Sequence, residues 1–171
     1  MKIFKKWVLP IGLVVLVVAI DQFTKWLTVR NIPLGERRSV IDGVFSLHHI
    51  QNTGMSFGLF QGGRWIFVAI TILLIAAMIY YYVKHVPKSR LGTGIRIAIL
   101  VLIGGALGNF YDRAFLGYVI DMLFVEFIHF PFIFNMADVF VVCSVIALAI
   151  MSFFVKEEPK KTKLSRKLKN E

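Results

Sequence analysis

Four long apolar segments dominate the sequence, and polar or basic stretches separate them. They cover about residues 7–29, 65–83, 95–114 and 137–155. Each is close to the roughly 20 residues that a helix needs to cross the hydrocarbon core of a bilayer. The pattern therefore predicts one all-α integral membrane domain, residues 1–155, with four transmembrane helices.

The first polar stretch, residues 30–64, contains a candidate β-hairpin. In SVIDGVFSLHHI, β-branched and aromatic residues surround Asp42-Gly43, a dipeptide typical of tight turns. We therefore expect a small β-platform outside the membrane. The sequence QNTG follows. Its Asn52 is interpreted first as a turn residue, and its Gly54 permits unusual backbone angles or close backbone approach.

Lysine and arginine residues indicate the orientation of the chain. Of the 20, fourteen lie in the N-terminal segment, the 84–96 linker and the tail, whereas five lie in or beside the two opposite loops. Positive residues favour the cytoplasmic side. We expect both termini to be cytoplasmic, residues 30–64 and 115–136 to be extracytoplasmic, and 156–171 to form a basic cytoplasmic tail. The first segment is long and lacks a small-residue cleavage site, so it is interpreted as an uncleaved helix.

Composition agrees with a membrane protein and excludes several classes of function. A hydrophobic content of 57% and a mean hydropathy of +0.73 exclude an ordinary soluble domain. The net charge of +10 is distributed in patches between apolar segments, which favours membrane topology over nucleic-acid binding. One cysteine precludes an intrachain disulfide, and the four histidines show no metal-ligand spacing. We expect no metal, no cofactor and no nucleic-acid partner, and a monomer.

Acidic residues gather near the third and fourth apolar segments. The stretch 104–138 carries four of the ten, namely Asp112, Asp121, Glu126 and Asp138. Ionisable groups beside a bilayer are costly and are candidates for function. Asp121 and Asp138 both fall at the predicted outer interface. Asp21 lies about fifteen residues into the first helix. At a rise of 1.5 Å per residue, this places it roughly 20 Å from the cytoplasmic end of that helix.

Two neighbouring carboxyls that share one proton can hydrolyse a peptide bond. Two carboxyls in contact cannot both be charged at low cost, so their pKa values separate and one keeps a proton while the other is ionised. The ionised carboxylate can then remove a proton from water, and the protonated carboxyl can protonate the carbonyl oxygen. The sequence has no GxSxG, no HExxH and no paired Cys–His. Asp121 and Asp138 are therefore the candidate catalytic pair, with no metal or nucleophile required.

Each polar residue also has a structural interpretation. Asn135 and Asp138 have the spacing of a helix N-cap with an acid at its third position. Asp121 fits an interfacial loop in contact with water, and Asp112 and Arg113 fit a neighbouring charge pair. Asp21 and Lys25, four residues apart, fit an intrahelical ion pair or a pair that faces the interior and supports the site. Gly104 and Gly108 form a GxxxG, which favours close helix packing.

Three other functions are compatible with carboxylates in membrane helices. A proton-coupled transporter should show internal repeats or broken helices, and neither is found. A non-catalytic scaffold would use the GxxxG and the helix pairs. A presenilin-like protease would account for Tyr111-Asp112, but its partner motif GxGD is absent.

Five motifs in order, DQFTK, QNTGMSFG, GGALGNFYDR, GYVID and FNMAD, resemble those of the lipoprotein signal peptidase family. The resemblance implies a multi-pass aspartyl endopeptidase of the bacterial cytoplasmic membrane, with its site at the outer leaflet interface. It would act on diacylglyceryl-modified prolipoproteins among membrane lipids, cutting before the modified cysteine. The family's catalytic aspartates match Asp121 and Asp138. Its residues that bind substrate or support the site match Asp21, Lys25, Asn52, Gly54, Asn109, Asp112, Arg113, Asn135 and Ala137.

Overall fold

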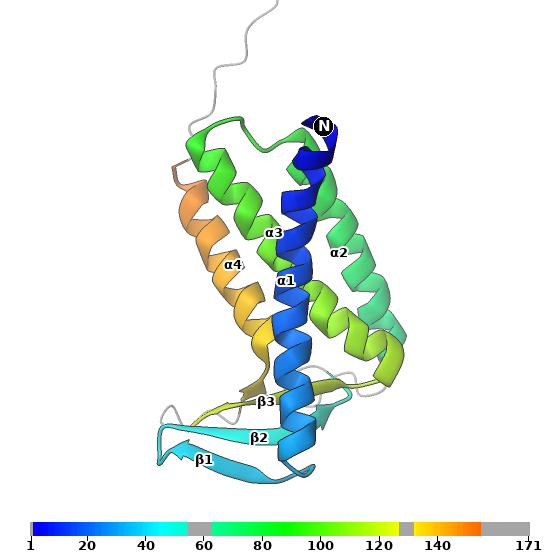
Figure 1. Ribbon diagram of the computed structural model, residues 1–171, viewed down its shortest axis with the longest axis vertical. Coiled ribbons are helices and arrows are strands. Elements are labelled where there is room, and N and C mark those ends of the chain that lie inside the picture. Colours follow the sequence, from blue (N-terminus) through cyan, green and yellow to red (C-terminus); the bar gives the residue numbers. More distant parts are fainter. Residues whose placement is uncertain (1, 55–62, 127–131, 155–171) are drawn as a thin grey trace, which may run out of the picture.

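Four helices lie side by side and a small sheet closes one end of the bundle, in a computed structural model of the chain (Figure 1). The structure describes residues 2–54, 63–126 and 132–154, so the 156–171 tail lies outside the described residues. The helices are α1 (Lys2–Asn31), α2 (Arg64–Lys84), α3 (Arg90–Tyr111) and α4 (Met136–Ser152). A π-helical turn, η2 (Asp112–Leu116), continues α3.

Three helical segments of the described chain are long and apolar enough to cross a membrane: Trp7–Asn31, Arg64–Lys84 and Arg90–Leu116. Helix α4 is apolar but has 17 residues, fewer than the sequence predicts for 137–155. The fold is thus mostly helical, with three candidate membrane helices and a small antiparallel sheet.

Helix α3 begins five residues before the expected position. Ser89 caps it, because its side chain accepts a hydrogen bond from the Gly92 backbone N–H at 3.0 Å. The apolar pattern becomes continuous only at Ile95, because Leu91 is the single large apolar residue in the first turn. At the other end, Gly117 terminates η2 with a φ of 89°, a left-handed conformation that glycine adopts without strain.

Glycines let the central helix α3 pack closely on its neighbours. A Cβ atom on Gly104 would lie 2.7 Å from the Cβ atom of Val17 in α1. A Cβ atom on Gly105 would lie 2.7 Å from the carbonyl oxygen of Ala137 in α4. The close-packing interpretation of the glycine motif is confirmed at Gly104. Helix α3 is therefore the element against which the others are positioned.

The sheet has the order β1-β2-β3-β4, with all neighbours antiparallel. Strands β1 (Arg37–Ile41) and β2 (Phe45–Asn52) form the expected hairpin, closed by a hydrogen bond from Val44 N–H to the Ile41 oxygen at 3.0 Å. A buried His49 joins β2 to the end of α1, because its Nδ1 lies 2.7 Å from the Ile32 oxygen.

The other two strands come from the segment 115–136, for which the sequence pattern predicts only a loop. They are β3 (Val119–Val125) and β4 (Ile133–Phe134). Strand β3 lies between β2 and β4, and its first four residues are all buried. A strand buried on both faces has no alternation of polar and apolar positions, so its sequence carries no strand periodicity.

Candidate active site

The two candidate catalytic residues come from different elements and line one cavity. Asp121 lies on β3, and Asp138 lies in the first turn of α4. The cavity has a volume of about 250 Å³, and both carboxyl groups belong to its lining. The supporting residues in the lining are Asn52, Gly54, Asn109 and Arg113.

Asp121 is a buried carboxyl held by two side-chain amides. Its Oδ1 accepts a hydrogen bond from Asn135 Nδ2 at 2.6 Å, and its Oδ2 accepts one from Asn52 Nδ2 at 2.9 Å. Its side chain is 2% exposed, so the interpretation as a water-contacting loop residue is wrong. Burial raises the pKa of Asp121 to about 7; the charge of Asp138 adds to this rise, and the two amide hydrogen bonds oppose it.

Asp138 takes part in a helix cap and in the site at once. Asn135 Oδ1 accepts from the Asp138 N–H at 3.0 Å, and Asp138 Oδ2 accepts from the Asn135 N–H at 3.2 Å. This reciprocal pair is a capping box, as the spacing predicts. The other oxygen, Asp138 Oδ1, accepts from Asn109 Nδ2 at 2.7 Å.

Two amides connect the carboxyl groups. Asn135 Nδ2 donates both to Asp121 and, at 3.0 Å, to the Oδ1 of Asn109, which in turn donates to Asp138. Asn135 is fully buried. The family resemblance implied that it binds substrate or supports the site; in the structure its amide binds protein groups, because the tertiary fold places it between β3 and α3.

A buried ionic cluster lies behind Asn109. Lys25 Nζ lies 2.8 Å from Asp21 and 2.9 Å from Asp112, and it donates to Asn109 Oδ1 at 3.1 Å. The side chains of the three charged residues are at most 1% exposed. Both interpretations of Asp21 and Lys25 therefore hold together: they form an intrahelical ion pair, and it faces the interior.

The carboxylates of this cluster also bind backbone groups of other elements. Asp21 Oδ1 accepts from the Ala137 N–H at 2.9 Å, at the start of α4. Asp112 Oδ2 accepts from the Ile120 N–H at 3.2 Å, beside Asp121 on β3. Asp112 is more than a neighbouring charge partner of Arg113: the two interact electrostatically, but the salt bridge of its carboxylate is with Lys25. The cluster thus joins α1, α3, α4 and β3.

Gln22 belongs to this cluster and was not among the predicted residues. Its Nε2 donates to Asp112 at 2.9 Å and to Asp21 at 3.1 Å. Adjacent residues of a helix do not normally share a face, so helical spacing does not group Gln22 with Asp21. The only available signal was its position inside the motif DQFTK.

Arg113 is the cationic side chain among the described residues that line the cavity. Its guanidinium lies 5.2 Å from the centre of the Phe67 ring and interacts electrostatically with Asp138 and Asp121. Gly54 donates its N–H to Asn52 Oδ1 at 3.1 Å, which leaves the amide hydrogens of Asn52 for Asp121. In residues 2–54, 63–126 and 132–154, no group of three or more candidate metal ligands occurs.

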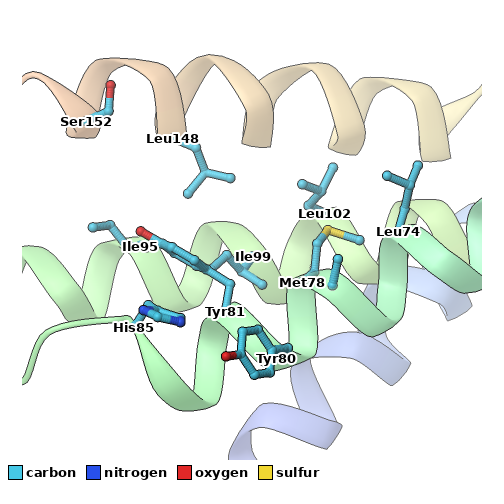
Figure 2. A pocket seen from close by; sticks show the side chains of 11 residues that line it. Leu74, Met78, Tyr80, Tyr81, His85, Ile95, Ile99, Leu102, Leu148 and Ser152 are labelled. Carbon is cyan, nitrogen blue, oxygen red and sulfur yellow. The ribbon is translucent and has the colours of Figure 1, made fainter.

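An apolar groove of about 700 Å³ runs along α3 between α2 and α4 (Figure 2). Ile95, Ile99 and Leu102 line it, and Asn109 and Arg113 line the small cavity. Four of these positions recur at helical spacing and so lie along one face of α3, and Arg113 follows in η2, which continues that helix. Leu74, Ala77 and Met78 border the groove from α2, and Leu148 and Ser152 border it from α4.

Comparisons with known proteins agree on one family. The family model described as signal peptidase (SPase) II matches residues 13–154. Lipoprotein signal peptidases of Streptococcus pyogenes serotypes M6 and M5 are each 43% identical over 136 residues, which is 80% of this chain and 87% of theirs.

Two solved structures, both described as bacterial membrane enzymes determined in meso, have a similar fold. One has a TM-score of 0.77 and 29% identity and covers 90% of this chain and 94% of its own. The other has a TM-score of 0.76 and 31% identity and covers 87% and 94%.

Proposed function

The chain belongs to the signal peptidase II family, membrane peptidases that remove signal peptides from prolipoproteins, and from this premise we propose that Asp121 and Asp138 are its catalytic pair. One observation carries the proposal: both carboxyls line one small cavity and are joined through two amides. Family membership also removes the transporter, the scaffold and the presenilin-like alternatives.

In the proposed reaction Asp121 holds the shared proton at rest, because its pKa is about 7. Asp138 removes a proton from water, whose oxygen bonds to the carbonyl carbon, while Asp121 protonates the carbonyl oxygen. When the C–N bond breaks, the proton on Asp138 passes to the leaving nitrogen. One hydroxyl proton returns to Asp121, which restores both groups.

The remaining site residues divide by position. Arg113 lines the cavity and would stabilise negative charge on the substrate carbonyl. Asn52 and Gly54 also line the cavity and would hold the backbone of the substrate. The other residues support the site from behind, and we propose positioning roles for Asp21, Lys25, Asn109, Asp112, Asn135 and Ala137.

We further propose that α4 is the fourth membrane span. Its 17 residues reach the lower end of the range for a transmembrane helix. With the positive residues inside, both termini are cytoplasmic and the sheet and the site lie at the outer leaflet. We propose that the protein works there as a monomer.

The substrate would be a diacylglyceryl-modified prolipoprotein that enters from the membrane, cut before its modified cysteine. The hydrophobic part of its signal peptide would occupy the groove along α3. The groove is lined from Leu74 to His85 on α2 and its C-cap, and over that stretch a helix rises about 16 Å. The apolar region of a signal peptide has about 7–15 residues, which as a helix spans a similar length. The groove therefore matches this segment in length and in its apolar lining.

The test uses detergent-purified protein and a diacylglyceryl-modified prolipoprotein, with the gel shift on signal-peptide removal as the readout. Asp121→Asn and Asp138→Asn should each abolish cleavage. Asp42→Asn is the matched control, since Asp42 lies exposed in the β1–β2 turn and should leave the rate unchanged.

Folding of each variant is verified by thermal unfolding. Both oxygens of Asp121 accept amide hydrogens, so an asparagine there would oppose one donor, and Asp121→Ala is a second variant without this conflict. If a folded Asp121 or Asp138 variant cleaves at nearly the wild-type rate, the catalytic assignment is wrong.

A further inference from the structure

The start of α1, the end of α2 and the start of α3 lie at the end of the bundle opposite the sheet (Figure 1), and a second polar cavity lies among them. Its volume is about 690 Å³, and it is bordered by the start of α1, the end of α2 and the start of α3. Three cations and two hydroxyl side chains form its polar lining: Lys88, Ser89, Arg90, Thr93 and Arg96. Trp7 and Tyr82 complete it with aromatic rings.

An apolar cavity of about 160 Å³ continues this polar one into the bundle. The two cavities share Trp7, Tyr82 and Val83. The apolar cavity is also lined by Val14 of α1 and Ile103 of α3, which lie further along their helices toward the sheet. A polar compartment at the helix ends thus adjoins an apolar one at the depth of the membrane core.

The cations of the polar cavity have no carboxylate partner in the described part of the chain. All salt bridges in the described part of the chain involve acids in the sheet or in the half of the bundle next to it, such as Glu126 and Asp21. Arg96 donates to the Val86 and Pro87 carbonyl oxygens at 2.7 and 3.0 Å, and these neutral groups do not compensate its charge. The N-terminus of α3 adds partial positive charge.

We propose that the two cavities together bind one anionic phospholipid of the cytoplasmic leaflet. Its phosphate lies among Lys88, Arg90 and Arg96, and one acyl chain occupies the apolar cavity. Charge complementarity selects an anionic headgroup, and the adjoining apolar cavity selects a lipid over a free anion. The proposal uses the membrane orientation proposed above but is independent of the catalytic pair.

Basic residues at a cytoplasmic interface also attract anionic lipids diffusely, so the test compares cations inside and outside the cavity. Full-length detergent-purified protein is titrated with phosphatidylglycerol or phosphatidylcholine and followed by native mass spectrometry. Wild type should retain one phosphatidylglycerol and bind phosphatidylcholine more weakly. At about 1 kcal/mol or fivefold per cation, Lys88→Gln with Arg90→Gln should weaken retention about 25-fold. Lys84→Gln, outside the cavity lining, should not.

The acyl-chain compartment is tested separately. Ile11 lines the apolar cavity and is 58% exposed, so Ile11→Trp should fill the cavity and weaken retention without disturbing a core. Leu16→Trp, on an exposed position of α1 outside that lining, is the matched control. Asp138→Asn should bind the lipid as wild type does, which separates this site from catalysis.

Three results would overturn the proposal. Equal retention of the two lipids would remove the anionic selectivity. If Lys84→Gln weakened phosphatidylglycerol retention as much, per charge removed, as the cavity variants do, the attraction would be diffuse. Competition by inorganic phosphate at the same concentration as the lipid would make the site one for a free anion.

Discussion

The ammonium group of Lys25 lies 3.1 Å from Asn109 Oδ1, and this contact determines which end of the Asn109 amide faces Asp138. A lysine ammonium only donates hydrogen bonds, so it selects the amide oxygen. The amide nitrogen then points at Asp138 Oδ1, 2.7 Å away. Lys25 is buried outside the lining of the cavity that holds the proposed catalytic pair, and its proposed positioning role would act through Asn109.

Replacing Lys25 by methionine should destabilise the protein strongly. Two buried carboxylates, Asp21 and Asp112, would lose their counter-charge, and breaking a buried ion pair costs about 3–5 kcal/mol. Thermal unfolding in detergent should therefore show a large fall in Tm.

The matched control is the neutral triple variant, Asp21→Asn, Lys25→Met and Asp112→Asn. It should recover much of the lost stability, but its kcat should stay low because the Asn109 amide is no longer oriented. An unchanged Tm for Lys25→Met alone would contradict the assigned role of the cluster.

Cleavage should slow as the pH rises through about 7. Asp121 is the proposed proton donor, and burial raises its pKa to about 7, so the active form loses its proton above that value. Measuring kcat/KM across that pH should show a fall that approaches tenfold per unit on the alkaline side. Asp42→Asn should keep the same profile, whereas a flat profile through pH 7 would contradict the assignment.

The same pKa predicts how stability depends on pH. Because the folded-state pKa of Asp121 is raised from its ordinary value of 3.8 to about 7, the folded state binds the extra proton between these values. The resulting stabilisation is fully present below about 3.8 and is lost as the pH rises to about 7. The Tm of Asp121→Asn relative to wild type should therefore increase over this range; a constant difference would argue against a raised pKa.

Alanine at Gly108 should disrupt the site through sterics alone. A Cβ atom there would overlap the carboxyl group of Asp21, which has no room to move because Lys25 and Ala137 hold it. Both Tm and cleavage rate should fall. A Cβ atom on Gly12 in α1 would have no neighbour within 4 Å, so Gly12→Ala should be neutral or stabilise by about 0.5–1 kcal/mol. Equal effects of the two changes would refute this account.

Filling the apolar groove should weaken substrate binding. Ala77 lines the groove and is exposed, so Ala77→Trp adds bulk there without displacing a core residue. KM for the lipidated prolipoprotein should rise about tenfold or more, which corresponds to about 1.4 kcal/mol. Ala76 is the adjacent exposed residue outside the lining, and Ala76→Trp should leave KM unchanged. A similar KM for both variants would mean that the substrate does not use the groove.

Local patterns were sufficient for several features of this protein. Apolar length predicted the helices, and Asp42-Gly43 predicted the hairpin, because both depend on neighbouring residues. The spacing of Asn135 and Asp138 predicted the capping box for the same reason. The motifs indicated the family, and the comparisons confirm it.

Features that join distant parts of the chain were decided only by the tertiary structure. Asp21 binds the backbone of Ala137, 116 residues away, and Asn135 bridges β3 and α3. Strand β3 pairs with a neighbour on each edge, and Asp121 is buried in it. The local sequence was equally compatible with a loop in which Asp121 contacts water. The sequence by itself determined which helices and which polar groups exist. Only packing decided which of those groups share a dry environment, because burial and charge pairing depend on contacts that no local window contains.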